Sequence, residues 1–480
     1  MRCPKVPRGI AAVGGSLLLA GLVSGESRRV LFLDDALVRS MEGIERRLHS
    51  PVPREEVFVF DAPWEGGESA YAAVMPAPEG YRLYYRGGGE TTREQTCVAF
   101  SSDGIAWERP NLGMHAFEGS TANNIIRMPT ERKAYAESHN FFVFQDTAPG
   151  VVPEERWKGL GLQYYHNEKG DPQRMLAAFV SPDGLRWTRT APEPAITQGA
   201  GFDSQNVAFR DPATGRFVCY SRTGREGFRF IQRCESENFR TWTVPEPIRF
   251  PEPPRTHFYT NAITPVPTLR PDDTPPVYVG MPMRFVPERK KVLGRATDAT
   301  SDAVLIASAD GVNWDFVAHE AWLRPGLDPA NWGNAHGNMT PARGILETGP
   351  GEWSVYWTEN YGSAAPLLRR GTLRPEGFVS LHGGAAGGVA EIGPLDLSGG
   401  RVVLNASTSA AGSIRLEVRN AAGDAVAGFT RDDFAPLWGD ALAIDVAWTG
   451  GAVLPAGLKD AALRIELKDA DVYSVRVVRE

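Results

Sequence analysis

Short apolar runs follow one another along most of the chain, many alternating with polar residues and bounded by Gly, Pro, Asn, Asp or Ser. Examples are TCVAF at 96–100 and RFVCY at 216–220. Alternation with a period of two is typical of half-buried strands, and short continuous apolar runs are typical of buried ones. No long segment repeats its apolar residues with the helical period of 3.6. The pattern therefore predicts an all-β protein.

A recurring corner divides the strand-rich region. It has the form Ser, any residue, Asp-Gly, two variable residues and Trp, and it occurs as SSDGIAW (101–107), SPDGLRW (181–187), SENFRTW (236–242) and SADGVNW (308–314). Asp-Gly supplies the positive φ angles of a tight turn, which Asn-Phe in the third copy fills less easily. Ser and Asp side chains hydrogen-bond the backbone of such turns, and the Trp then has a fixed place to be buried. Strand-only repeats of about 50–80 residues predict a β-propeller.

Strand-like segments before each corner complete the repeating unit, and a fifth unit without a corner ends near Leu381. We expect five blades of about four strands, with RRVLFLDDALV and IERRLHSP supplying an outer strand that closes the ring. HGGAAGG then forms a flexible joint, and strands spaced by about 8–12 residues suit a β-sandwich. The expected division is a five-bladed β-propeller over 26–382 and a β-sandwich over 388–480.

Residues 1–25 have the pattern of a signal peptide. Three basic residues in the first eight precede the apolar run IAAVGGSLLLAGLVSG, and small residues suit cleavage before Glu26. A membrane anchor is the alternative, but the run is short and rich in Gly and Ala, which favours cleavage. No later stretch is apolar enough to cross a bilayer. We therefore expect a secreted or periplasmic protein with no membrane span after cleavage.

Composition narrows the function classes. The 480 residues, 42% hydrophobic and 10% aromatic, are typical of a globular chain with a large and a small domain. A net charge of −7 without a basic face argues against a nucleic-acid partner. The sequence motifs of serine hydrolases, P-loop proteins, zincins and dinucleotide-binding folds are absent from the mature sequence. Cys97, Cys219 and Cys234 fall in strand-like runs, either as buried thiols or with a Cys219–Cys234 bridge.

The innermost strands of a propeller line a central funnel, so the polar and aromatic residues that open each inner strand are the candidate binding residues. They are Trp64, His139, Asn140, Gln205, Asn206, His257, Tyr259, Asn261, Trp332 and His336. The aromatic side chains in this set can stack on a sugar ring, and the Asn and Gln amides can hydrogen-bond its hydroxyl groups. The alternative for any one of them is polar lining of a wet channel.

Two acids stand out in this set, Glu65 and Asp203, which belong to blades one and three. Facing carboxylates suit glycosidic bond hydrolysis, because one protonates the leaving oxygen and the other activates water or attacks the sugar. Asp35 and Glu359 are further candidate catalytic acids. Asp211 fits a plain hairpin turn better than a catalytic site.

Three arginines, Arg86, Arg222 and Arg284, end second strands and suit a clamp for a carboxylate or sulfate, with rim salt bridges as the alternative. The histidines at 139, 257 and 336 fit hydrogen-bonded channel residues better than a metal site. We therefore predict no metal ligand and no cofactor, and leave open a structural ion in the channel.

LFLDD, PWEG, SSDGIAWERPNLG, FDSQNVAFRD, RPGLDPANW, LRRGTLRPEGFVSL and LNASTSAAGSIRLEVRNAAGDAVAGF together resemble a group of exported bacterial glycosyl-hydrolase-like proteins. These are related to the five-bladed β-propeller glycoside hydrolase families 32 and 43. The resemblance implies a propeller followed by a sandwich, with activity on plant or algal glycans. It matches Glu65 to a first-blade acid, although WEG replaces the Asp-containing motif, and the Glu-Cys motif of fructosidases is not matched by Cys234-Glu235.

The first functional hypothesis is thus an exported glycoside hydrolase with Glu65 and Asp203 as its acid pair and a poly- or oligosaccharide as its partner. A non-catalytic carbohydrate-binding propeller is the second. An enzyme for acidic or sulfated sugars, with the arginines as a clamp, is the third. The sugar, the linkage and the oligomeric state stay open.

Overall fold

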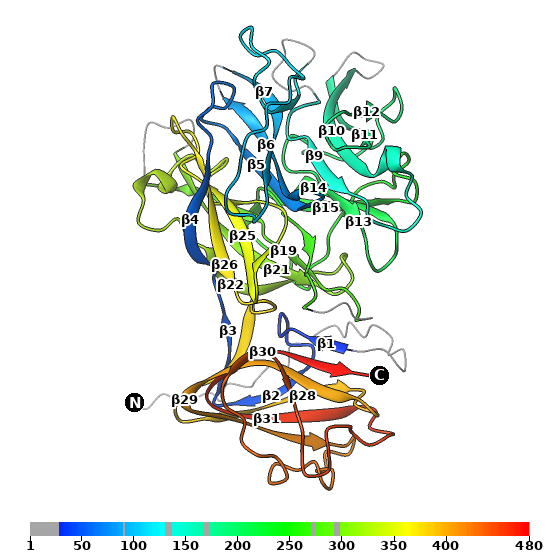
Figure 1. The fold of residues 1–480 in the computed structure, drawn as a ribbon, viewed down its shortest axis with the longest axis vertical. Helices are drawn as coiled ribbons and strands as arrows, with labels where there is room; N and C mark the ends of the chain where they lie inside the picture. Colours follow the sequence, from blue (N-terminus) through cyan, green and yellow to red (C-terminus); the bar gives the residue numbers. More distant parts are fainter. Residues whose placement is uncertain are drawn as a thin grey trace, which may run out of the picture.

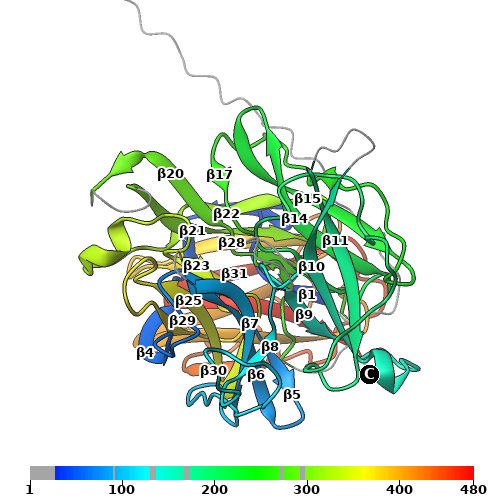
Figure 2. The same ribbon diagram turned by 90° about the horizontal axis from the view of Figure 1, so that it is seen from above.

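Five antiparallel sheets, three of four strands and one each of five and six, surround a common axis in the computed structural model, which describes residues 28–89, 92–129, 137–166, 172–269, 274–291 and 298–479. The signal peptide predicted for residues 1–25 lies outside the described residues. Figure 1 shows the ring from the side above a second, smaller domain, and Figure 2 views it from above. The predicted all-β, five-bladed propeller is confirmed. The described helices are two short 3-10 turns, η1 (Pro153–Glu155) and η2 (Pro329–Trp332).

The first three blades each run outward through four consecutive antiparallel strands. Blade one holds β5 (Ala70–Ala77), β6 (Gly80–Gly89), β7 (Thr92–Ser101) and β8 (Ile125–Arg127). Blade two holds β9 (Phe142–Gln145), β10 (Trp157–His166), β11 (Pro172–Ser181) and β12 (Thr188–Arg189). Blade three holds β13 (Val207–Arg210), β14 (Phe217–Arg225), β15 (Phe228–Ser236) and β16 (Glu246–Pro247).

Blades four and five have interrupted strands. In blade four the inner strand is split into β17 (His257–Phe258) and β18 (Thr264–Pro265), and the next into β19 (Tyr278–Gly280) and β20 (Met283–Lys290). Its outer strands are β21 (Ala299–Ser308) and β22 (Asp315–Leu323). Blade five holds β23 (Thr340–Pro341), β24 (Leu346–Gly349), β25 (Glu352–Glu359) and β26 (Leu367–Leu373).

An N-terminal strand closes the ring, as predicted, but it is a different one. β4 (Val52–Val59) pairs with β26 as the outer strand of blade five. The earlier segments, expected to do this, instead pair with the second domain.

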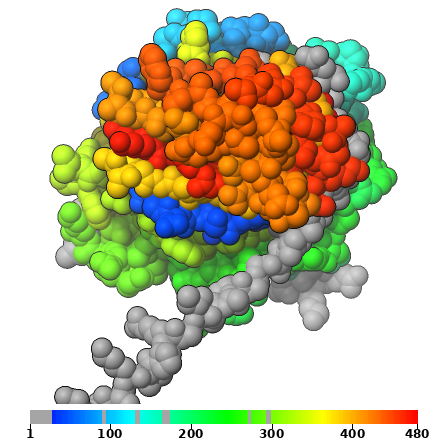
Figure 3. Space-filling view, turned by 90° about the horizontal axis from the view of Figure 1, so that it is seen from below, coloured from blue at the N-terminus to red at the C-terminus, as the bar shows by residue number. Residues whose placement is uncertain are grey.

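The second domain is built on the long strand β31 (Ala461–Val478), which pairs with four others. The set contains β1 (Arg28–Val30), β2 (Val38–Glu42), β3 (Ile44–Leu48), β27 (Val379–Gly383), β28 (Gly388–Leu395), β29 (Arg401–Arg419) and β30 (Asp440–Asp445). Residues 28–48 and 379–382 therefore pair with this domain and not with the propeller where we expected them. The physical reason is edge pairing: β1, β2 and β3 cover strand edges that would otherwise be open. In Figure 3 the blue N-terminal segment lies beside the orange and red strands.

One hydrophobic core runs through both domains. It includes Leu31 and Leu33 after β1, Trp322 and Trp353 from blades four and five, and Leu463 from β31. The shared core makes the second domain part of the base of the propeller, on the side away from the residues that open the inner strands.

Each corner is built by the side chains that the sequence predicts. Asp103 Oδ1 accepts the backbone N–H groups of Ile105 and Ala106 at 2.8 Å, and Ser101 Oγ accepts that of Gly104 at 2.8 Å. The other three copies repeat this pattern. Phe239 of the third copy adopts the positive φ of +64° that glycine occupies elsewhere.

The corners also join neighbouring blades, which explains why the chain repeats them. The glycine carbonyl of the corner accepts a tyrosine hydroxyl from the preceding blade in three copies: Tyr356 to Gly104 at 2.6 Å, Tyr84 to Gly184 at 3.2 Å, and Tyr220 to Gly311 at 2.7 Å. In the third copy Phe239 packs instead on Phe144 of blade two, with ring centroids 5.7 Å apart.

Gly311→Ala is expected to lower the free energy of unfolding by more than the backbone strain of a positive φ alone would cause. The φ of +72° costs an alanine about 1–2 kcal/mol. In addition, a Cβ would lie 2.6 Å from the Tyr220 hydroxyl, so the blade-to-blade hydrogen bond is lost at about 1–3 kcal/mol more. The matched control is Gly215→Ala, with a φ of +69° and nothing within 4 Å of a Cβ. Urea unfolding of both variants measures the difference, and equal losses would contradict the docking role.

The three described cysteines are buried free thiols. Cys219 and Cys234 face each other in register on β14 and β15, without a bridge. No helix in the described ranges has the length and apolarity needed to span a bilayer.

Candidate active site

All five blades contribute side chains to one polar network at the funnel. Arg86 of β6 donates to Asn140 Oδ1 at 3.1 Å and to the Tyr361 hydroxyl at 3.0 Å. Asn140 Nδ2 donates to the backbone carbonyl of Asp203 at 3.2 Å. These contacts connect blades one, two, three and five. Arg222, whose guanidinium lies 4.8 Å from the Tyr259 ring centroid, adds blade four.

Two carboxylates take part in this network, Glu94 of β7 and Asp203 before β13. Glu94 accepts a hydrogen bond from His139 Nδ1 and lies 3.4 Å from Arg86. The Nε2 atom of the same imidazole lies 3.3 Å from the Asp203 carbonyl oxygen. His139 therefore stands between the two acidic residues.

Arginines surround the Asp203 carboxylate. Arg222 donates to Oδ1 at 2.5 Å and Arg174 donates to Oδ2 at 2.7 Å. Burial acts to raise the pKa of Asp203, but the two guanidinium groups outweigh it and hold that pKa below its ordinary value. Burial also acts to raise the pKa of Glu94, but Arg86 and the hydrogen bond from His139 hold that pKa below its ordinary value. Both carboxylates are therefore ionised at neutral pH.

An aromatic wall with a cation on it completes the funnel. His336 stacks on the rings of Tyr259 and Phe285 at 5.4 and 5.8 Å. The Arg229 guanidinium lies 5.1 Å from the first of these rings and 4.7 Å from the second. Burial, followed by the charges of Arg229 and Arg222, lowers the pKa of His336, so this imidazole is neutral at neutral pH.

Arg229 has no acidic partner within the part of the chain that the structure describes. Its backbone N–H donates to His257 Nδ1 at 3.1 Å, and the guanidinium of this half-buried residue lies over the rings of Tyr259 and Phe285. The funnel therefore presents a positive charge that no described carboxylate neutralises.

Glu65, predicted as one of the two catalytic acids, is a structural residue. Its side chain is fully buried, and Arg109 donates to its two oxygens at 3.0 and 2.7 Å. It also accepts the Tyr85 hydroxyl and the Ala62 N–H. No lone pair is left to face a substrate, so the proposed pairing of Glu65 with Asp203 is wrong for a physical reason: the carboxylate belongs to the core beneath the first blade.

Asp35 and Glu359 also lie outside the funnel network. Asp35 pairs with Arg46 at 2.8 Å, and its side chain is 71% exposed in the N-terminal segment that joins the sandwich. Glu359 accepts the Trp357 indole N–H at 2.8 Å and pairs with Arg369 at 3.0 Å, which in turn reaches Glu56 on the outer strand. Both predictions of catalytic acids are corrected, because these carboxylates lie outside the network of the funnel and pair with Arg46 and Arg369 elsewhere.

Several predicted binding residues have hydrogen-bond partners of their own, within one blade or between two blades. Asn261 Nδ2 donates to the carbonyls of Gln205 and Tyr220, and Gln205 Oε1 accepts the Ala262 N–H. The remaining members have their own partners: Asn206 with Phe202, Trp64 with Asn124, Trp332 with Gly326 and Lys291, and Arg284 with Asp302. Buried amides satisfy backbone groups, which explains this use.

The sequence-predicted residues that the structure does bring together are Arg86, His139, Asn140, Asp203 and Arg222, with Tyr259 and His336 on the aromatic wall. His257 lies at the edge of that wall, 5.8 Å from the Phe285 ring centroid. Asp211 is a turn residue, as expected: it accepts Ala213 N–H and the Thr214 hydroxyl.

Sequence reasoning missed Glu94, Arg174, Arg229, Phe285 and Tyr361. They lie at the ends of second and third strands or in loops, whereas the prediction considered mainly the openings of inner strands. The charged positions on these hairpin ends were the available signal.

Among the described residues no three His, Cys, Asp or Glu side chains gather as a metal site. His139, His257 and His336 are instead engaged by Glu94, by a backbone N–H and by ring stacking, respectively.

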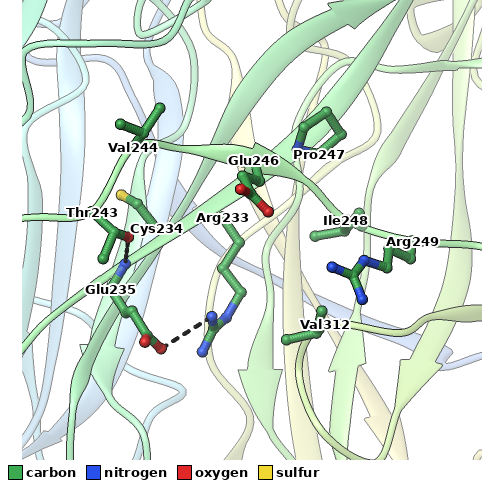
Figure 4. Close-up of a pocket in the computed structure, with 10 residues that line it drawn as sticks. All are labelled: Arg233, Cys234, Glu235, Thr243, Val244, Glu246, Pro247, Ile248, Arg249 and Val312. Carbon is green, nitrogen blue, oxygen red and sulfur yellow. Dashed lines mark hydrogen bonds and ion pairs between the residues drawn. The ribbon is translucent and has the colours of Figure 1, made fainter.

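A separate hollow of about 250 Å³ lies outside the funnel, between the outer strands of blade three and the fourth corner (Figure 4). Its lining includes Arg233, Glu235, Glu246, Arg249 and Val312. Arg233 pairs with Glu235 at 3.3 Å. The hollow gathers no set of groups comparable with that of the funnel.

No protein-family model matches the chain, and no curated protein matches it. Among solved structures it is similar to an N-acetylgalactosamine deacetylase from F. plautii in complex with blood group B trisaccharide (15% identity, TM-score 0.43, covering 69% of this chain and 95% of the other). It is also similar to a glycosyl hydrolase from Bacteroides ovatus (14%, 0.42, 70% and 95%). A third is a fructofuranosidase from Schwanniomyces occidentalis complexed with fructosylnystose (10%, 0.38, 88% and 96%). The chemistry of this chain therefore has to be inferred from its own funnel residues.

Proposed function

We propose that this protein is an exported glycoside hydrolase that cleaves a glycan carrying a carboxylate or sulfate group. The observation that carries the proposal is the cationic, aromatic wall, where Arg229 lies on Tyr259 and Phe285 without an acidic partner among the described residues. An aromatic face can stack on the apolar side of a sugar ring. A guanidinium without an acidic partner can donate two parallel hydrogen bonds to a carboxylate or sulfate group.

The funnel also supplies groups for hydrolysis, with a different pair from the one predicted. Asp203, held ionised by Arg222 and Arg174, accepts a proton from the attacking water. His139, paired with Glu94, donates a proton to the leaving glycosidic oxygen from Nε2, which gives up its 3.3 Å contact with the Asp203 carbonyl to do so. The water oxygen bonds to the anomeric carbon as the glycosidic C–O bond breaks, so one product gains the hydroxyl group of water and the other gains the proton of His139. Transfer of the proton from Asp203 through solvent to His139 then restores both groups. This step draws on side chains and water alone.

The decisive experiment compares matched substrates. Oligosaccharides containing a uronate or a sulfate are assayed beside their carboxyl-reduced or desulfated forms. We expect the wild-type protein to cleave the anionic member preferentially. Arg229→Gln should lower kcat/KM on that member by about 10–100-fold, the value of one charge-assisted contact, and leave the neutral member nearly unchanged.

The matched control is Arg225→Gln. Arg225 lies at the end of β14 near Arg229, but it is 3.8 Å from the exposed Glu226 and outside the aromatic wall. It should keep the wild-type preference. An equal loss on neutral and anionic substrates in Arg229→Gln would contradict the anionic substrate class. Binding of anionic glycans without cleavage of any of them would contradict the enzyme and leave a carbohydrate-binding propeller.

A further inference from the structure

Arg343 extends its side chain from blade five across the axis of the propeller to blade three. Its backbone joins blade five to blade one, with Arg343 N–H donating to the Ala72 carbonyl at 3.0 Å and the Val74 N–H donating to the Arg343 carbonyl at 2.8 Å. Its guanidinium lies 5.6 Å from the ring centroid of Phe209, on the inner strand of blade three. Blades five and three are not neighbours in the ring, so the side chain crosses the axis.

The Arg343 guanidinium lies deeper in the propeller than the funnel residues proposed to bind the substrate. Phe209 pairs with Val218 on β14, four residues before Arg222 on the same strand. At about 3.3 Å per residue, the guanidinium lies roughly 13 Å deeper than the level of Arg222. Arg343 is therefore separate from the proposed hydrolytic site.

No described group neutralises Arg343. It takes part in no ion pair within the described ranges, and its Nε is buried without a hydrogen-bond partner. Its surroundings are apolar: Ala342 and Val74 are buried, and so is Phe209. The nearest acid along β13, Asp211, is occupied by the Tyr278 hydroxyl and by its own turn.

Burial is the one cause that acts on this guanidinium, and it lowers the pKa of Arg343 to about 10. Buried charges in proteins are ordinarily paired, because an unpaired one loses its hydration without compensation. The residue keeps partial access to solvent, so a small solute can reach it.

We propose that the axial channel holds a small monovalent inorganic anion, of the chloride class, against the guanidinium of Arg343. The anion accepts the N–H group of Arg343 Nε that the protein leaves unpaired and neutralises the guanidinium beside Phe209. We expect a small anion in place of a large one, because the neighbouring side chains of Val74, Ala342 and Phe209 are buried and apolar.

The test measures thermal unfolding of the full mature chain at constant ionic strength, in sodium chloride and in sodium gluconate, whose anion is too large for the channel. An ion that binds only the folded state raises the unfolding midpoint. At a hundredfold excess over its dissociation constant, the rise for a chain of this size is about 3 °C. The wild-type midpoint should rise by about this amount in chloride. Arg343→Met should show no rise, and in gluconate it should unfold at or above the wild-type midpoint, because its core contains no unpaired charge.

Arg229→Met is the matched control, since it removes a guanidinium from the funnel and should keep the chloride response. Crystals soaked in sodium bromide should show an anomalous peak beside Arg343. The proposal is overturned by equal wild-type midpoints in chloride and gluconate, by a chloride response that survives in Arg343→Met, or by the absence of bromide from the channel. None of these outcomes depends on hydrolytic activity, so failure here and failure of the proposed reaction are distinguishable.

Discussion

Asp203→Asn is expected to lower kcat about a thousandfold on the anionic substrate while leaving KM within a few-fold of wild type. The amide keeps the shape of the side chain but cannot accept the proton of the attacking water, and a positioned general base contributes about 10²–10⁴-fold. Steady-state kinetics of the purified variant measures the effect. A kcat within tenfold of wild type would remove Asp203 from the reaction.

The pH profile gives an independent check on the same residue. Burial would raise the pKa of Asp203, but Arg222 and Arg174 outweigh it, and the folded-state pKa lies below the ordinary value of about 4. A base works in its ionised form, so kcat/KM should persist as the pH falls and decline only below about pH 4. Arg222→Gln removes one of the two charges and should move this acidic limb upward.

Glu65→Gln is the matched control for Asp203→Asn, because it makes the same chemical change at a buried carboxylate outside the network. It removes the charge that pairs with Arg109 and should lower the free energy of unfolding by about 1–3 kcal/mol. The folded fraction should retain its kcat. Loss of kcat in the folded Glu65→Gln variant would return Glu65 to the candidate catalytic acids.

Glu376→Ala is expected to cost about 3–5 kcal/mol of unfolding free energy, the usual loss when one member of a buried ion pair is removed. Glu376 lies in the connection from β26 to β27, and its side chain is fully buried. The Glu376 carboxylate pairs with Arg29 of β1 and with Arg476 of β31. It also accepts a hydrogen bond from the Ser474 hydroxyl at 2.6 Å. Its removal leaves two buried guanidinium groups without this carboxylate at the base of the propeller.

The matched control is Glu237→Ala, at an ion pair with Arg216 in which the glutamate side chain is 76% exposed. Exposed pairs contribute about 0–1 kcal/mol, so this variant should unfold close to wild type. Denaturant unfolding of both variants separates the two cases. A loss in Glu376→Ala no greater than that in Glu237→Ala would show that the buried cluster does not couple the N-terminal strand, the connection and the sandwich.

The corners were predictable because their chemistry is local. Ser101, Asp103 and Gly104 lie within four residues and bond one another's backbone, so the spacing alone identifies the turn, its repeats and hence the blades. Asp203 and His139, which the pattern of polar residues opening apolar strands singled out, lie together in the funnel network, and their roles in the reaction stay a prediction. The prediction failed at Glu65, since a carboxylate that opens an inner strand and one that neutralises Arg109 have the same local sequence pattern.

The assignment of β1, β2 and β3 failed for a related reason. Alternating apolar residues define a strand and its buried face, but they do not say which open edge the strand covers. That choice depends on β27, β28 and β31, which lie more than 300 residues further along the chain.

The all-β class, the five repeating units and the turn at each corner follow from the order of residues, because these depend on alternation and on hydrogen bonds among neighbouring residues. Which charges meet depends on how the chain folds in three dimensions. Asp203 meets Arg222 through the pairing of strands within blade three, whereas Glu94 and His139 come from different blades and are brought together by closure of the ring. Electrostatic partnership depends on distance in space, which the order of residues along the chain does not contain.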